Sequence, residues 1–87
     1  MQINHTTQQP YNGENQSALE DLQVKSGYRS NEWLTFLQAK QSNRKIKAGE
    51  HGIRLVKVTE REDENGNKQR RIKSFVVFNL DQTEVNN

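Results

Sequence analysis

The sequence predicts an α+β fold, with two or three short helices packed on a small antiparallel sheet that contains a β-hairpin (about 53–60 and 68–79). Two observations predict it. Runs rich in β-branched and aromatic residues, 53–59 and 72–78, flank Asn65-Gly66, a dipeptide typical of hairpin turns. The segments before them instead carry helix caps and apolar residues at helical spacing. We therefore expect the helices to precede the hairpin in the chain.

The two ends of the chain are predicted to lie outside the fold. Residues 1–10 are polar and rich in Gln, Asn and Thr, which is typical of a disordered tail. Residues 81–87 are predicted to be a polar C-terminal tail, and residues 11–80 a single domain. Because only 30% of the 87 residues are hydrophobic, the core must be small and the domain marginally stable.

A first helix is predicted after the turn at 11–15. Leu19 and Leu22 share one helical face, while acidic and amide side chains occupy the other. Asn15 is a suitable N-cap, and Gly27 is suited to the position just after the last turn. The apolar face is narrow, so this helix should lie on a sheet rather than be surrounded.

A second helix is predicted to begin after Thr35 and to end near Asn43. Thr35 and Gln38 have the spacing of a capping box. The side chains expected to face inward are Phe36, Leu37 and Ala39.

The hairpin register follows from placing Asn65-Gly66 at the centre of the turn, so that Leu55 faces Val76 and Val56 faces Phe75. In this register one face of the hairpin carries Ile53, Leu55, Ile72, Val76 and Phe78, and the other carries Val56, Val58, Phe75 and Val77. Residues 45–47 are expected to add a third strand next to Ile53, after a sharp turn at Gly49 and Gly52.

Charge is distributed unevenly along the chain. Residues 1–24 carry a net charge of −3, residues 25–57 carry +6, and residues 58–87 carry −1. A basic middle third is the electrostatic signature of a polyanionic partner, although a solvated face of scattered cations is an equally simple interpretation.

Single-stranded nucleic acid is bound without sequence preference by cationic grooves with aromatic platforms. The candidate DNA-binding residues are Arg44, Lys45, Lys47, Arg54, Lys57, Lys73, Tyr11, Tyr28 and Trp33. In so small a core, Trp33 and Phe36 are more often structural than stacking residues. Arg70 and Arg71 point to opposite faces, so at most one of them belongs to any one patch.

No catalytic constellation is evident, and we expect a protein that is not an enzyme. The chain has no cysteine and only His5 and His51, which make no metal-ligand set, so no cofactor is expected. Glu50 and His51 in a glycine-flanked turn are better explained as a solvated turn than as an acid–base pair. Without a signal peptide or an apolar run long enough to span a bilayer, a cytoplasmic protein with no membrane partner is expected.

Four segments, taken in order, are similar to a known family. They are Tyr11-Asn12-Gly13-Glu14-Asn15, then Gly27-Tyr28 with Trp33 to Ala39, then Ile46 to Gly52, and Val77 to Thr83. Over about residues 11–83 the chain resembles the N-terminal domain of ArdC-type antirestriction proteins of plasmids and other mobile genetic elements.

This resemblance implies single-stranded DNA binding with little sequence preference, in a role that protects DNA from nucleases. Full-length members often carry a zinc-protease-like domain with a His-Glu-x-x-His motif, which this sequence lacks, so no protease activity is expected. The alternative is a protein-interaction module that docks onto a DNA-processing partner through a sheet edge or the acidic hairpin tip.

Overall fold

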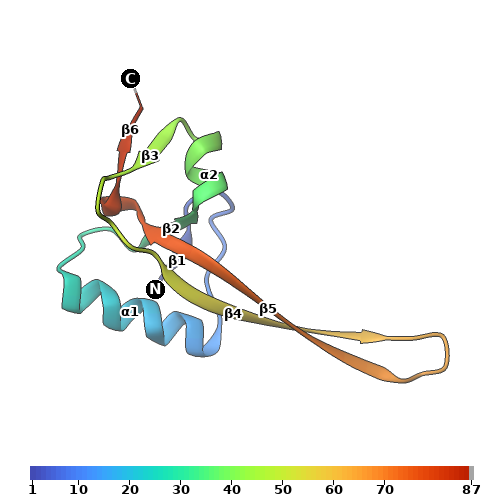
Figure 1. Cartoon of the computed structure of the whole chain (residues 1–87). Coiled ribbons are helices and arrows are strands. Elements are labelled where there is room, and N and C mark those ends of the chain that lie inside the picture. Colours follow the sequence, from blue (N-terminus) through green and yellow to red (C-terminus); the bar gives the residue numbers. More distant parts are fainter. Residues whose placement is uncertain (87) are drawn as a thin grey trace.

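The computed structural model describes residues 1–86 of the chain. Figure 1 shows a small body from which a long two-stranded hairpin projects, and the overall dimensions are 52 × 27 × 23 Å. The elements in chain order are β1 (Ile3–Asn4), α1 (Gly13–Ser26), β2 (Glu32–Thr35), α2 (Phe36–Gln41), β3 (Arg44–Ile46), β4 (Ile53–Glu62), β5 (Lys68–Asn79), a 3₁₀ turn η1 (Leu80–Gln82) and β6 (Thr83–Val85). Neither described helix is long and apolar enough to cross a membrane.

The predicted α+β class and the hairpin are confirmed. The main sheet has the strand order β1-β2-β5-β4, and β2, β5 and β4 are antiparallel neighbours. It is a mixed sheet, because β1 runs parallel to β2. A second sheet consists of β3 and β6 and lies at the end of the molecule away from the hairpin tip (Figure 1).

The core lies between α1 and the base of the hairpin. Leu19 of α1 packs with Trp33 of β2, Leu55 of β4 and Val77 of β5, and all four side chains are at most 2% exposed. Gly27 ends α1 in the left-handed conformation, as predicted. The N-cap of α1 is Asn12 and not Asn15, whose side-chain amide instead donates to the Val56 carbonyl oxygen at 2.8 Å.

The prediction of a disordered tail over residues 1–10 is wrong. Gln2 is buried, and its Oε1 accepts a hydrogen bond of 2.7 Å from the indole nitrogen of Trp33. Its Nε2 donates to Gln23 Oε1 at 2.7 Å. The next two residues along the chain form β1, which pairs with β2. Polar composition was misleading here because glutamine amides supply the partners that a buried indole N–H and backbone groups require.

The C-terminal tail prediction is also wrong for residues 81–86. Asn79 and Gln82 form a second capping box around η1, with Asn79 N donating to Gln82 Oε1 at 2.8 Å. The chain then continues as β6 against β3, in antiparallel register. The third strand that was predicted next to Ile53 is β3, and it pairs with β6 instead. Position 87 lies outside the described residues.

The predicted hairpin register is off by one residue. Leu55 pairs with Phe75, and Val56 pairs with Ser74. The loop has five residues rather than a two-residue turn, since Asp63 N donates to the Asn67 carbonyl oxygen and Asp63 Oδ1 accepts from the amide nitrogens of Asn65 and Asn67. A one-residue shift exchanges the faces of one strand relative to the other, so the predicted faces were wrong.

The inward face of the hairpin carries Ile53, Leu55, Phe75 and Val77, which pack on the core. Val56, Val58, Ile72 and Val76 occupy the other face and are between 41% and 68% exposed. Gly52, just before β4, lies so close to β5 that a Cβ atom there would stand 2.4 Å from Val76 Cγ1 and 2.9 Å from the Val77 carbonyl oxygen.

The second helix is shorter than predicted, although its cap is confirmed. Thr35 and Gln38 form the capping box, with Gln38 N donating to Thr35 Oγ1 at 3.1 Å. Only Ala39 of this helix is buried, whereas Phe36 and Leu37, expected inside, are 63% and 62% exposed. Directly before this helix, β2 directs Trp33 and Leu34 into the protein.

We expect the substitution Gln2→Ala to destabilise the protein by about 1–3 kcal/mol, because it leaves the buried indole N–H of Trp33 without an acceptor. Urea unfolding followed by Trp33 fluorescence measures this change. Gln9→Ala, at an exposed position of the same segment, is the matched control and should shift the free energy of unfolding by less than about 0.5 kcal/mol. Equal stability of the two variants would contradict the structural role assigned to residues 1–10.

Candidate functional site

A groove of about 460 Å³ lies between the N-terminal segment, the start of α1 and the base of the hairpin. The N-terminal segment contributes Asn4, Thr7, Gln9 and Pro10, and the hairpin contributes Val56, Lys57, Val58 and Phe75. Between them lie Tyr11 and Asn12, which precede α1, and Gly13 and Asn15 of its first turn. Among these lining residues Lys57 is the only cation and none is a carboxylate. The groove therefore combines apolar and amide surface with a single positive charge.

Tyr11 is held at the groove by residues distant in sequence. Its backbone nitrogen donates to the Gln2 carbonyl oxygen at 3.1 Å, and its carbonyl oxygen accepts from Gln16 Nε2 at 2.8 Å. Asn4 Nδ2 donates to the phenol oxygen at 3.1 Å. Partial burial raises the pKa of Tyr11, with a smaller opposing effect from the Asn4 hydrogen bond.

Phe75 and Lys57 reach the groove from neighbouring strands of the hairpin. Phe75 packs against the core on one side and is half-buried, so part of its ring is available to a ligand. Lys57 is exposed, and Lys73 lies directly opposite it across the hairpin. Tyr11, Phe75 and Lys57 thus line one groove, and Lys73 is paired with Lys57 beside it.

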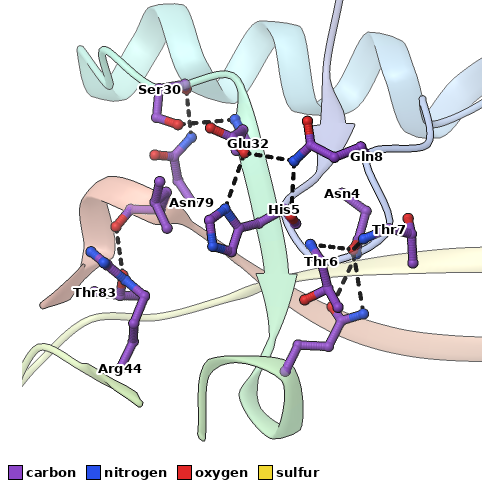
Figure 2. A network of polar contacts seen from close by, with 12 residues as sticks. Asn4, His5, Thr6, Thr7, Gln8, Ser30, Glu32, Arg44, Asn79 and Thr83 are labelled. Atoms are coloured by element: carbon purple, nitrogen blue, oxygen red, sulfur yellow. Dashed lines mark hydrogen bonds and ion pairs between the residues drawn. The ribbon is translucent and has the colours of Figure 1, made fainter. Parts of the chain in front are cut away.

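The wall of the groove formed by residues 4–10 is tied to β2 by a polar network (Figure 2). Asn4 Oδ1 accepts from the amide nitrogens of Thr6 and Thr7 at 2.9 and 3.0 Å. His5 Nδ1 and Gln8 Nε2 both lie 3.0 Å from Glu32 Oε1. Gln8 has a positive φ of 60°, and the loop that passes through it returns at Pro10 to bridge with Ile3.

These contacts lower the pKa of Glu32. The hydrogen bond from Gln8 is the main cause, followed by the one from His5, because both stabilise the carboxylate form. Among residues 1–86 no group of three or more His, Cys, Asp or Glu side chains is arranged to hold a metal ion.

The structure brings together three of the sequence-predicted site residues, namely Tyr11, Lys57 and Lys73. It separates them from Arg44 and Lys45, which lie on β3 in the second sheet, and from Lys47, which follows β3. Arg44 Nε donates to Thr83 Oγ1 at 2.8 Å, and Lys45 Nζ lies 3.4 Å from Glu84 Oε1. The +6 segment therefore does not form one basic surface.

The other three predicted site residues are also displaced from the groove. Arg54 pairs with Val76 and lies on the hairpin face opposite to Leu55. Trp33 is fully buried, and Tyr28 packs edge-on against it with 6.0 Å between ring centroids. Trp33 is therefore part of the core and not free to stack on a ligand. Tyr28 packs against the core and is half-buried, and it does not line the groove.

Sequence reasoning missed the groove wall formed by residues 4–10 and underrated Phe75, which lines the groove. The wall had one local signal, because Asn4 followed by Thr6 and Thr7 is a favourable pattern for a side-chain turn. The position of the wall depends on a two-residue strand and on contacts to β2, which no local pattern reveals.

Polar side chains of the segment 77–83 hold the fold together. Asn79 is fully buried and its Nδ2 donates to the Ser30 carbonyl oxygen at 2.8 Å (Figure 2). Asp81 Oδ2 accepts from the amide nitrogens of Arg29 and Ser30 at 2.6 and 3.2 Å. This segment therefore joins the end of β5 to the loop that leads into β2.

Comparisons with known proteins agree on one family. The family of N-terminal domains of the anti-restriction factor ArdC matches residues 1–80. The metal-free crystal structure of the antirestriction protein ArdC from plasmid R388 has 34% sequence identity and a TM-score of 0.81, and its Mn(II)-bound structure has 31% and 0.82. Both alignments cover 100% of this chain and 33% and 35% of those chains, so the chain spans about a third of their length. No curated protein matches the chain.

We expect Glu32 to make the stability of the protein depend on acid pH. Because its pKa is lower in the folded than in the unfolded state, its contribution is present above the unfolded-state pKa and is lost as the pH falls through the folded-state pKa. Below about pH 4.5 the difference in unfolding free energy between the wild type and Glu32→Gln should therefore shrink. Urea midpoints across a pH series measure it.

Glu64→Gln, in the exposed hairpin loop, is the matched control and should show no such change. A wild-type advantage over Glu32→Gln that stays constant down to pH 3 would contradict the role of the network in Figure 2.

Proposed function

The chain belongs to the family of N-terminal domains of ArdC antirestriction factors, and from this premise we propose that it binds single-stranded DNA in the groove beside Tyr11. The family relates the chain to antirestriction. The observation that carries the proposal is the meeting of two partly exposed aromatic rings, Tyr11 and Phe75, with the opposed cations Lys57 and Lys73. In this arrangement bases stack on the rings while phosphates lie against the lysines.

The chemistry of the groove favours a single strand over a duplex. Bases in a duplex are already stacked on each other, so only an unpaired strand can present its base faces to Tyr11 and Phe75. Little sequence preference is expected, because every base has a π-face and stacking does not read hydrogen-bond patterns. In this role the protein covers the strand and keeps nucleases from it, without a reaction of its own.

A second candidate function is docking onto a protein of the DNA-processing machinery. It is favoured by the exposed apolar side chains Val56, Val58, Ile72 and Val76 and by the outer edge of β4, which pairs with no strand of the described chain. An exposed apolar strand edge can add to the sheet of another protein. A pull-down from host lysate after nuclease treatment separates the functions, since only a protein partner is retained after the DNA is removed.

Binding to fluorescent oligothymidine, followed by anisotropy at two salt concentrations, tests the principal proposal. We expect Lys57→Ala to reduce the salt slope of binding by about 0.7, the value for one phosphate contact on a single strand. Lys45→Ala is the matched control, because it removes the same charge from β3, far from the groove, and should leave the slope unchanged. No binding by the wild type at low salt would refute the function itself, and equal effects of the two variants would refute the site.

Substitution of Tyr11 tests stacking separately from charge. Tyr11→Ala should weaken binding by about 1–3 kcal/mol, the value of one stacked base, with little change in salt slope. Tyr11→Phe is the matched control, since it keeps the ring and removes only the hydrogen-bond acceptor of Asn4 Nδ2. Circular dichroism and urea unfolding check that both variants are folded. Equal loss of binding by both would show that the ring face is not used.

A further inference from the structure

The hairpin extends well beyond the part that packs on the core. β4 and β5 stay paired from Ile53 with Val77 to Glu62 with Lys68, but the contacts that join the hairpin to α1, in the core and between Asn15 and Val56, lie at or next to its base. The distal part, residues 56–74, is here called the arm, and Figure 1 shows it projecting away from the body. A two-stranded ribbon is only marginally stable by itself in water. An arm of this length therefore suggests a role in contact with another molecule.

The observed register sorts the charges of the arm onto different faces. Directly opposed residues share a face, so Lys57 with Lys73, Thr59 with Arg71, and Arg61 with Gln69 lie on the face that carries Phe75. Lys57 and Phe75 of this face line the groove, as do Val56 and Val58 of the other face. This is the cationic face, and it consists of Lys57, Arg61, Arg71 and Lys73 without a carboxylate. On the other face Glu60 opposes Arg70 and Glu62 opposes Lys68, so the charges there are balanced.

The cationic face has unfavourable electrostatics without a ligand. Lys57 and Lys73 are directly opposed, and like charges in this position destabilise a strand pair. The ion pairs found among residues 1–86, His5–Glu32 and Lys45–Glu84, involve none of its four cations. An anion that lies along the face would relieve this repulsion, and a phosphate chain offers one anion after another.

The spacing on the arm suits a nucleic-acid backbone. Alternate residues of a strand lie about 6.6 Å apart on the same face, which is comparable to the separation of successive phosphates in an extended single strand. The ribbon also twists, as Figure 1 shows, so the cationic face winds around the arm. A flexible single strand can follow this winding path more readily than a stiff duplex can.

We infer that the cationic face of the arm is a second nucleic-acid contact, which continues from the groove and receives the phosphates of the same single strand. This inference rests on the proposed single-stranded DNA binding and extends it by naming where the strand runs after it leaves the groove. Arg61 and Arg71, which do not line the groove, bind phosphates of the nucleotides beyond those that stack on Tyr11 and Phe75.

The test compares a short oligothymidine of about five nucleotides, which fills the groove alone, with one of about 15 nucleotides that also reaches the arm. We expect Arg61→Ala with Arg71→Ala to weaken binding of the long strand about 25-fold at 0.1 M salt and to reduce its salt slope by about 1.4, since each phosphate contact contributes about 0.7 to that slope. Binding of the short strand should be unchanged.

The matched control is Lys68→Ala with Arg70→Ala. It removes two positive charges from the same two-stranded arm, but from the balanced face. Unchanged binding of the long strand by this control supports a contact on the cationic face. Equal weakening by both pairs would mean that only net charge matters, and no weakening by the arginine pair would mean that the strand leaves in another direction. Either result overturns the inference.

The two strand lengths distinguish the inference from the proposed function. If the wild type binds the short strand and the double substitution Arg61→Ala with Arg71→Ala does not weaken binding of the long strand, the proposed binding in the groove is retained and the arm contact is refuted. If the wild type binds neither strand at low salt, the proposed function fails and the inference fails with it.

Discussion

The register of β4 against β5 is the constraint on which both the core and the proposed interface depend. The five-residue loop at 63–67, held by Asp63, places Leu55 opposite Phe75 rather than opposite Val76. This pairing brings Phe75 to the inner face, where it meets Leu55 and Tyr11. The same register places the four cations of the cationic face on one side of the arm and the opposed acidic and basic pairs on the other. A shift of one residue would remove one ring from the groove and mix the charges of the two faces.

Polar side chains make many of the contacts that stabilise the fold of this small protein. With few apolar residues available, amide side chains bridge segments that lie far apart in sequence. Gln2 joins the N-terminus to Trp33 and to α1, and Asn79 joins β5 to the loop at Ser30. Gln38 caps α2 and also donates to Asn4. Because buried amides satisfy both donors and acceptors, such bridges hold a small core together with little apolar area.

The distribution of cations illustrates why net charge along a sequence is an incomplete guide to a binding surface. The middle third of the chain passes through both sheets, so its charges reach opposite ends and faces of the molecule. Lys45 faces Glu84 on β6, while Lys57 faces another lysine. The interface that we propose instead combines Tyr11 with two neighbouring strands, β4, which begins inside the +6 segment, and β5, which lies outside it.

The sequence by itself determined the class of the fold, the hairpin, the capping box at Thr35 and the family. Each of these rests on interactions between residues a few positions apart, or on an ordered set of motifs, and both can be read from one chain. The Thr35 cap is an example, because its partner Gln38 is three residues away. Tyr11 and Lys57 could likewise be proposed from residue type and charge.

Only the tertiary structure decided the strand register, the role of residues 1–10 and the position of the groove. The register depends on a loop conformation in which Asp63 Oδ1 accepts from the amide nitrogens of Asn65 and Asn67, whereas the Asn65-Gly66 dipeptide alone favours a two-residue turn. The N-terminal strand is only two residues long, and it is stable because Trp33 and β2 provide partners for Gln2 and β1. Contacts between residues 30 or more positions apart cost chain entropy that only the complete fold offsets, so no short segment could reveal them.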